Sequence, residues 1–293
     1  MVHYMVVIAV ASGKGGTGKT AIATSLALVA NNCCQILDCD VEAPNVSLYL
    51  PFRTNQEIKA ARSVPEIDTQ VCTYCGECAK VCQYNAIVIA PKVTMTFPEL
   101  CHSCGACFIA CSIPGAIKEI DRVIGTIRKG KTRNGHEVIE GRINIGEAIA
   151  TPLIKQVKEN IKPNILTIID SPPGNGCPVV ESISGADFVF LVTEPTPFGV
   201  YDLSLAIELT QVLNLSTGVI INREGIGSSQ KLEELCRRTN VPILLRIPFD
   251  RKIAEEYSRG RVLVDIMPSL RRPLQILLGD VVNKMELRRE FSL

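Results

Sequence analysis

The chain has 293 residues, enough for one large or two small domains, and it can bury a hydrophobic core without support from disulfides. Its 31 Lys and Arg residues against 30 Asp and Glu residues give a formal charge of +1, which disfavours general binding of nucleic acid or of an anionic membrane. Polar residues or glycines interrupt every apolar run before the roughly 18 residues of a membrane span, so we expect a cytoplasmic protein.

The first forty residues predict a strand, a glycine-rich loop, a helix and a second strand. Residues 4–12 (YMVVIAVAS) are almost continuously apolar and rich in β-branched residues, as expected for a strand buried on both faces of a parallel sheet. We expect a helix over residues 20–32 and a strand over residues 34–40 (CQILDCD) that ends in acidic residues. This order is one βαβ unit.

Residues 13–20 (GKGGTGKT) lie between the first strand and the helix, the context that the Walker A pattern G-x-x-x-x-G-K-[ST] requires. In this pattern backbone N–H groups face a polyphosphate, Lys19 reaches its β and γ phosphates, and the Thr20 hydroxyl ligates Mg²⁺. A glycine-rich turn that binds nothing is the weaker alternative, because the octapeptide is complete. The expected phosphate-binding residues are Gly13, Gly15, Gly16, Thr17, Gly18, Lys19 and Thr20.

The sequence pattern changes between residues 62 and 121, where cysteines appear and the alternation of long strands with long helices stops. This segment has 3 Lys and 1 Arg against 6 Asp and Glu, a formal charge of −2, so the remaining chain carries +3. Of 13 cysteines, eight lie between Cys72 and Cys111, and an odd total does not suit a fully paired disulfide framework. We therefore expect an inserted, metal-binding domain here.

The eight cysteines form two motifs, each with the spacing C-x2-C-x2-C-x3-C of a bacterial ferredoxin. In that pattern three close thiolates hold one 4Fe-4S cluster and the fourth serves the other. Zinc bound by paired CxxC motifs is the competing interpretation, and the third close cysteine in each motif argues against it. Gln83 and Ser112 stand where a proline usually follows the fourth cysteine. The expected ligand sets are Cys72, Cys75, Cys78 and Cys111 for one cluster, and Cys101, Cys104, Cys107 and Cys82 for the other.

After the insert the strand and helix alternation returns. Residues 122–143 alternate in period two around glycines, which predicts a hairpin that leads the chain back to the main sheet. We then expect apolar strands over residues 165–170, 188–193, 218–222 and 242–247, with helices over 201–213 and 228–239. The fold class is therefore α/β, a doubly wound, mostly parallel sheet with a small α+β insert. The expected division is an ATPase domain of residues 1–61 and 122–293, interrupted by a ferredoxin-like domain of residues 62–121.

Several motifs together resemble the MinD, ParA, Mrp and nitrogenase-iron-protein group of P-loop ATPases. Lys14, directly after the first glycine, is typical of the deviant Walker A loop of this group. Asp38-Cys39-Asp40 resembles its switch I region, and Asp170 followed by SPPG resembles its Walker B and switch II region. Four residues lie where these proteins hold the nucleotide base, namely Asn222, Arg223, Pro248 and Asp250.

The resemblance implies a catalytic role for Lys14, Lys19, Asp40 and Asp170. Lys14 would reach the nucleotide of the partner subunit in an ATP-dependent homodimer. Asp40 would position the attacking water, while Asp38 and Asp170 would support Mg²⁺ together with Thr20. The implied cofactors are ATP or ADP, Mg²⁺ and two 4Fe-4S clusters, since the whole chain resembles MinD-superfamily ATPases with an inserted ferredoxin domain.

Three uses of such a protein remain open at this point. The first is ATP-gated electron transfer to an unknown redox partner, and the second is assembly or transfer of an iron-sulfur cluster or metallocofactor for a client protein. The third is a positioning protein like MinD whose clusters sense redox state. Mrp-type carriers usually have a CxxC pair near the C-terminus, and here no CxxC exists outside the insert, which slightly favours electron transfer.

Two further expectations concern the rest of the chain. Cys177 lies in the stretch where the nitrogenase iron protein, a relative of the group that this chain resembles, has a cluster-ligating cysteine. It either contacts a bridging cluster or a redox partner near the two-fold axis of a dimer or, as we favour, is a small buried residue. Residues 270–293 have apolar positions at helical spacing, and a helix docked on the core is favoured over a membrane-targeting tail. The remaining cysteines, Cys33, Cys34, Cys39 and Cys236, are expected to pack as apolar residues.

Overall fold

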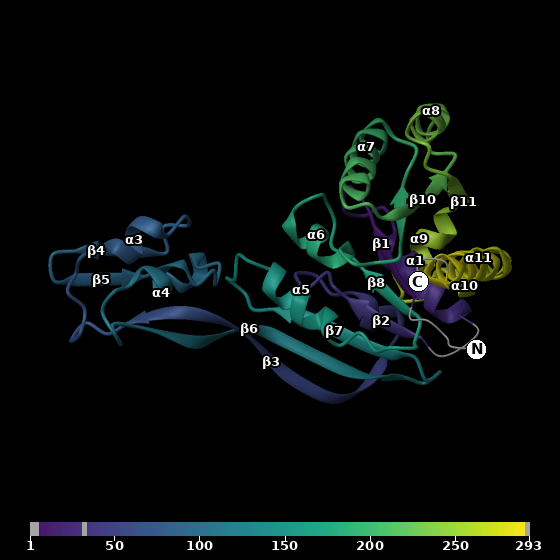
Figure 1. The fold of residues 1–293 in the computed structure, drawn as a ribbon. Helices are drawn as coiled ribbons and strands as arrows, with labels where there is room; N and C mark the ends of the chain where they lie inside the picture. The colour runs from purple at the N-terminus through teal and green to yellow at the C-terminus, as the bar shows by residue number, and fades with distance from the viewer. Residues whose placement is uncertain (1–5, 31–33, 291–293) are drawn as a thin grey trace.

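A large, mostly parallel β-sheet forms the centre of the molecule in the computed structural model, which describes residues 6–30 and 34–290 (Figure 1). Within these residues the sheet has nine strands in the order β11-β10-β9-β1-β8-β2-β7-β6-β3. From β11 to β7 all pairings are parallel, whereas β7 with β6 and β6 with β3 are antiparallel. The strands are β1 (Val7–Ala11), β2 (Gln35–Asp38), β3 (Phe52–Ile67), β6 (Ile117–Thr132), β7 (Glu137–Ile143), β8 (Thr167–Asp170), β9 (Phe188–Thr193), β10 (Ser216–Glu224) and β11 (Ile243–Pro248).

The central strands are apolar along their whole length because helices cover both faces of the sheet. All residues of β1 and β9 are buried, as continuous runs of Val, Ile, Phe and Ala require. One apolar core lies between the sheet and α5 (Thr151–Lys158), α6 (Cys177–Ile183), α7 (Pro197–Val212) and α8 (Gln230–Thr239). The other core joins the opposite face to α1 (Lys19–Val29), α2 (Val46–Tyr49), α9 (Arg251–Tyr257), α10 (Leu263–Ile266) and α11 (Arg271–Glu290). The predicted doubly wound α/β architecture is confirmed.

Strands β3 and β6 form a long antiparallel ribbon that leaves the main sheet. Their register runs from Phe52 opposite Thr132 to Ile67 opposite Ile117. The hairpin predicted over residues 122–143 is confirmed, since β6 pairs with β7 and returns the chain to β2. The sequence analysis assigned no strand to residues 52–61, and both expected domain boundaries fall inside continuous strands. The division into domains therefore stays a prediction.

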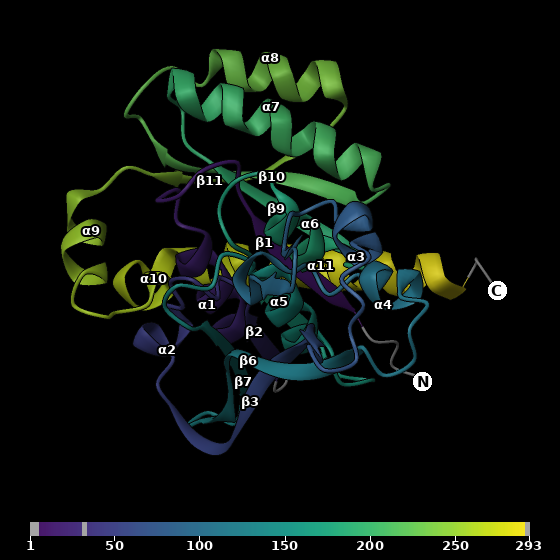
Figure 2. The same ribbon diagram turned by 90° about the vertical axis from the view of Figure 1, so that its left-hand side faces the viewer.

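The far end of the ribbon holds a small lobe, residues 68–116, which we call the cysteine lobe. It lies at the left of Figure 1, away from the helices of the main body, and faces the viewer in Figure 2. Helices α3 and α4 pack together in it beside a two-stranded antiparallel sheet of β4 and β5. Its elements are α3 (Glu77–Val81), β4 (Ile87–Ala90), β5 (Val93–Thr96) and α4 (Ala106–Ala110).

The C-terminal segment forms α11, whose apolar residues face the core. Leu274, Leu278, Val281 and Met285 are buried at helical spacing, so the prediction of a docked helix is confirmed. Among the described residues, no helix is both long and apolar enough to cross a membrane. Predictions for residues 4–5, 31–32, Cys33 and 291–293 lie outside the described residues.

Replacing Leu153 by Ala tests the packing of α5. This side chain is fully buried against β6 and β7, where a Cβ built on Gly125 would lie 2.9 Å from Leu153 Cδ2. The cavity left by the substitution should lower the free energy of unfolding by about 2–5 kcal/mol, measured by urea denaturation. Val212→Ala, at a side chain that is 73% exposed on α7, serves as control and should change it by less than about 0.5 kcal/mol. Equal effects of the two substitutions would contradict the packing described.

Candidate functional site

The glycine-rich loop lies between β1 and α1, at the carboxyl end of the central strands. Gly18 has φ of +99° and precedes the first helical residue, Lys19, so only a residue without Cβ adopts this turn easily. Gly13 is required by close approach, since a Cβ there would lie 2.3 Å from the Asp202 carbonyl oxygen of α7. The backbone is thus shaped as a Walker A loop.

Lys19 is buried between two carboxylates from neighbouring strands. Burial lowers the pKa of Lys19, while the charges of Asp170 and Asp40 raise it. Burial likewise raises the pKa of Asp40, and the Lys19 ammonium opposes that rise. The loop lysine and the predicted switch I aspartate therefore face the same space.

Asp38 and Asp170 end adjacent parallel strands, β2 and β8, and both are buried. Burial raises the pKa of Asp170 to about 7, although the Thr20 hydroxyl donates a hydrogen bond to its Oδ2 at 2.6 Å. Burial and the nearby Asp170 charge raise the pKa of Asp38 well above its ordinary value. Asp38 accepts hydrogen bonds from the backbone N–H groups of Val46 at 2.9 Å and of Asp40 at 3.2 Å.

This acidic pair fits a Mg²⁺ ion. Asp170 Oδ1 is buried and has no hydrogen-bond partner among the described residues, while its other oxygen contacts the Thr20 hydroxyl. A divalent cation would supply the missing partner and compensate two carboxylates that burial otherwise disfavours. Carboxylate and hydroxyl oxygens are the ligands that Mg²⁺ prefers, usually in the company of substrate phosphates.

Lys14 is held within its own chain by a buried carboxylate, Glu194. The Lys14 ammonium forms an ion pair with Glu194 Oε1, and Arg223 Nη1 donates to Glu194 Oε2 at 2.9 Å. The Glu194 side chain is only 8% exposed. Glu194 is not among the site residues predicted from the sequence, although an acidic residue directly after the predicted strand 188–193 is a usable signal.

Of the four residues predicted to hold the base, Asn222 and Arg223 lie near the end of β10, Pro248 ends β11 and Asp250 follows it. Asn222 Nδ2 donates to the Thr17 carbonyl oxygen at 2.8 Å, so it supports the loop from outside. Asp250 Oδ1 accepts from the Lys252 N–H at 2.8 Å and caps α9, while Pro248 pairs in register with Glu224. The Arg223 guanidinium forms an ion pair with Glu194. Their role in base binding stays a prediction.

The eight clustered cysteines surround two hollows in the cysteine lobe. The larger, about 480 Å³ including space open to solvent, is also lined by residues 63–65 of β3. The smaller, about 330 Å³, is lined by Ile67 at the end of β3 and lies further along the ribbon. We call them the proximal and the distal hollow. The proximal hollow is lined by Cys82, Cys101, Cys104 and Cys107, and the distal hollow by Cys72, Cys75, Cys78 and Cys111.

Each hollow thus receives three close cysteines from one motif and the fourth from the other. This is the exchange that the ferredoxin spacing predicts. The two motifs also share one backbone conformation. Tyr74 and Ser103 have φ of +59° and +55°, and their N–H groups donate to Cys72 Sγ and Cys101 Sγ, each at 3.4 Å. Such N–H···S hydrogen bonds stabilise thiolate ligands and tune a bound cluster.

The thiols line the walls of each hollow. Among the residues that the structure describes, no group of three or more His, Cys, Asp or Glu side chains is arranged to hold a metal ion. A zinc ion needs its sulfur ligands about 2.3 Å from one point, whereas a cubane binds each thiolate at a separate iron corner. Burial raises the pKa of Cys78 and Cys107, so a metal ligated by these thiols would have to displace their protons. Four cysteines line each hollow, which is the donor set that a 4Fe-4S cluster takes.

The other cysteines differ in exposure. Cys177 is exposed at the first residue of α6, so the favoured prediction of a buried residue is wrong. A contact near a dimer axis stays a prediction. Cys34, Cys39 and Cys236 are buried, as predicted.

Comparisons with known proteins identify the family of this chain and proteins that share its fold. The family model described as CobQ/CobB/MinD/ParA nucleotide binding domain matches residues 8–264. An uncharacterized protein of Methanocaldococcus jannaschii is 32% identical over 265 residues, covering 87% of this chain and 90% of its own. A protein of the same organism named iron-sulfur cluster carrier protein is 22% identical over 301 residues, covering 97% and 86%. The structure of the septum site-determining protein MinD with Mg-ADP from Pyrococcus horikoshii has a TM-score of 0.55 at 19% identity, covering 94% and 96%, and shares the fold.

Asp170→Asn should stabilise the chain when nucleotide and Mg²⁺ are absent. Because burial raises the folded-state pKa of Asp170 to about 7, the wild type loses stability as the pH rises from about 4 through 7. An uncharged Asn escapes this loss. We expect the thermal midpoint in EDTA to rise by at least about 2 °C at pH 8 and by less at pH 6.

The matched control is Asp280→Asn on the exposed side of α11, which should leave the midpoint unchanged at both pH values. A gain from Asp170→Asn that is as large at pH 6 as at pH 8 would show that the buried charge is not its cause.

Proposed function

Because the chain belongs to the CobQ/CobB/MinD/ParA family of nucleotide-binding proteins, we propose that it is a Mg²⁺-dependent ATPase that dimerises with ATP and carries two 4Fe-4S clusters. Its use would be ATP-gated electron transfer to a partner protein. The observation that carries the proposal is the distribution of the cysteines. The two ligand sets expected from the cysteine spacing each line a separate hollow. Both hollows lie at the end of the β3–β6 ribbon, and β3 and β6 belong to the main sheet.

The proposed hydrolysis uses positioned charges rather than a covalent intermediate. The loop N–H groups and Lys19 would bind the β and γ phosphates, and Asp40 would orient the attacking water. Mg²⁺, held by Thr20 and Asp170 with Asp38 behind them, would neutralise charge on the phosphates. The orphaned Asp170 Oδ1 supports this assignment. Phosphoryl transfer depends mostly on such positioning and charge neutralisation.

Lys14 provides the proposed link between hydrolysis and dimerisation. In the single chain its ammonium is paired with Glu194. To reach the phosphates of a partner subunit it has to leave this carboxylate, which Arg223 would still compensate. ATP binding would therefore favour the dimer by offering Lys14 a more highly charged partner than Glu194.

The cysteines would bind the clusters as two crossed sets, with Cys82 and Cys111 as the exchanged ligands. Each cluster supplies one-electron redox chemistry when bound. The N–H···S bonds to Cys72 and Cys101 support thiolate ligation at corresponding positions of both motifs. Assembly or transfer of clusters is the second candidate, favoured by the likeness to a relative named iron-sulfur cluster carrier protein.

Lys14→Ala should reduce ATP hydrolysis by about 100-fold or more, because a cation supplied in trans is typically worth 10³–10⁵ in phosphoryl transfer. Binding of a fluorescent ATP analogue to the monomer should change by less than about threefold, since Lys14 serves the partner's nucleotide. Lys231→Ala, on the exposed side of α8, is the control for loss of a lysine. Unchanged hydrolysis in Lys14→Ala would refute the proposed cross-subunit role.

Paired cysteine variants test the crossed ligand sets. Cys111→Ser should lose about half of the bound iron, and adding Cys72→Ser should cost little more, because both residues line the distal hollow. Adding Cys101→Ser to Cys111→Ser should instead remove nearly all iron, because Cys101 lines the proximal hollow. The readouts are iron and zinc per chain and the EPR signal of anaerobically purified, reduced protein.

Cys236→Ser, at a buried cysteine of α8, is the control and should keep all iron. Bound zinc in place of iron, or equal losses in the two double variants, would contradict the crossed clusters.

The fate of the iron separates the two candidate uses. An electron-transfer protein should keep its clusters through many cycles of ATP hydrolysis in the presence of an apo-ferredoxin acceptor. A carrier should lose iron to that acceptor in proportion to ATP consumed. We expect retention, measured as iron per chain after separation of the two proteins.

A further inference from the structure

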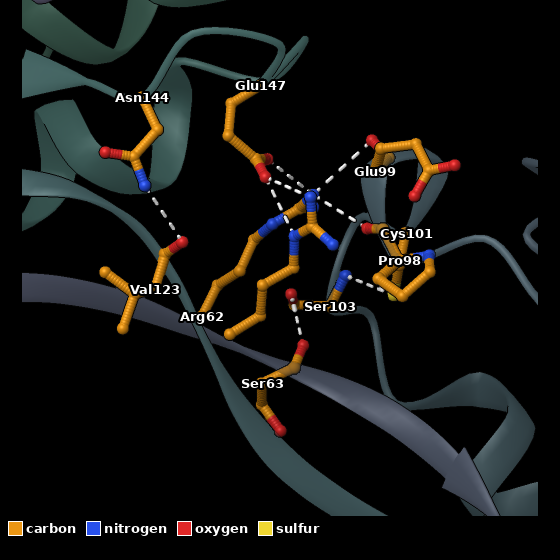
Figure 3. A network of polar contacts seen from close by, with 10 residues as sticks. Arg62, Ser63, Pro98, Glu99, Cys101, Ser103, Val123, Asn144 and Glu147 are labelled. Carbon is orange, nitrogen blue, oxygen red and sulfur yellow. Dashed lines mark hydrogen bonds and ion pairs between the residues drawn. The ribbon is translucent and has the colours of Figure 1, made fainter.

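A buried charge network joins the cysteine lobe to the main body (Figure 3). Arg62 of β3 donates through Nη2 to the Pro98 carbonyl oxygen at 2.8 Å and contacts the Glu99 carbonyl oxygen at 3.4 Å. The same nitrogen pairs with Glu147 Oε2 at 3.1 Å, in the loop before α5. Arg122 of β6 donates through Nε to Glu147 Oε1 at 2.8 Å.

This network has a buried pair at its centre and a net positive charge. Two guanidinium groups share one carboxylate, so the net charge is +1. The side chains of Arg62 and Glu147 are 2% and 3% exposed, whereas that of Arg122 is 33% exposed. Arg62 Nε and Nη1 are buried without hydrogen-bond partners among the described residues. Because the guanidinium stays protonated, its charge is compensated only in part and acts through a medium of low dielectric.

The charge lies beside the proximal hollow and not beside the distal one. Arg62 precedes residues 63–65, which line the proximal hollow, and its acceptors Pro98 and Glu99 lead directly into Cys101. The Ser103 hydroxyl also donates to the Ser63 carbonyl oxygen at 2.6 Å, so the Cys101 loop is fastened to β3 on both sides.

Carboxylates near the two hollows do not cancel this difference. Glu119 lines the proximal hollow and Glu77 the distal one, and both are exposed. Glu77 is further paired with Lys80 at 2.7 Å. Exposed charges are screened by water and salt, whereas the buried Arg62 guanidinium is screened much less.

We propose that Arg62 gives the cluster in the proximal hollow a more positive reduction potential than the cluster in the distal hollow. This rests on the proposed function, since it requires both clusters. Net charge near a cluster is one of the factors that set its potential, and a buried cation favours the reduced, more negative form. With both clusters bound, Arg62 would favour an electron from an external low-potential one-electron donor in the proximal hollow rather than in the distal one. One electron would then leave the cluster held in the distal hollow and one would enter the cluster held in the proximal hollow, with no bond or proton exchanged.

The direction of the potential shift in charge variants tests the proposal. The network carries +1 in the wild type, 0 in Arg62→Gln, +1 in Arg62→Lys and +2 in Glu147→Gln. Anaerobic EPR-monitored redox titrations of the full chain give both potentials, and Cys111→Ser and Cys82→Ser identify which signal belongs to which hollow.

We expect Arg62→Gln to lower the reduction potential of the proximal cluster by about 59 mV, which corresponds to a tenfold change in the equilibrium constant of a one-electron reduction. Glu147→Gln should raise that potential, and Arg62→Lys should leave it near the wild-type value. The distal potential should stay the same in all three variants.

Shifts in the same direction in Arg62→Gln and Glu147→Gln would show that the loop geometry acts instead of the charge, and would overturn the proposal. Equal wild-type potentials would do so as well. If Arg62→Gln loses the proximal cluster, Glu147→Gln decides alone, since it keeps Arg62 and its carbonyl contacts, and an unchanged potential there refutes the inference. Absence of iron from the wild type would instead refute the proposed function.

Discussion

The antiparallel pairing of β3 with β6 is the constraint on which the rest of the structure depends. Both strands are 16 residues long, and their pairing leads from the main sheet into the cysteine lobe, with register shifts between Thr54 and Gln56 and between Ala60 and Ala61. The two strands lie so close together that a Cβ built on Gly130 of β6 would lie 2.1 Å from the Arg53 carbonyl oxygen of β3. Two paired strands therefore join the lobe to the sheet, and the two hollows lie in sequence along one ribbon.

The carboxyl edge of the sheet carries charges that the nucleotide-free fold does not balance. Asp38 and Asp170 are buried side by side, and the raised pKa of each shows what the fold loses by holding them there. The Lys14 ammonium forms an ion pair with Glu194 of the same chain. Local rules of polar satisfaction tend to be broken at functional sites, and in the proposed function a bound cation and phosphates would compensate the charges at these positions.

Much of the fold and site followed from local sequence patterns. Continuous apolar runs identified β1, β8, β9 and β10, and residues 13–20 identified the phosphate loop, because their chemistry is contained within a few neighbouring residues. The start of β3 was missed because its first residues are exposed and polar and show no apolar periodicity. Glu194 and the pairing of Arg62 with Glu147 were missed for another reason: Lys14 and Glu194 are 180 residues apart in the chain, and Arg62 and Glu147 are 85 apart. The exposure of Cys177 shows that the burial of a lone cysteine cannot be predicted from the residue type alone.

The central claim is that nucleotide state and cluster state are energetically linked through the shared sheet. The most direct measurement is the EPR spectrum of dithionite-reduced, anaerobically purified protein with Mg-ADP or with Mg²⁺ and a non-hydrolysable ATP analogue, together with the rate of ATP hydrolysis by oxidised and reduced protein. The account predicts that the ATP analogue changes the cluster signal relative to ADP, and that reduction changes the hydrolysis rate. Identical spectra and identical rates would contradict it and would leave the cysteine lobe as a docking or storage module.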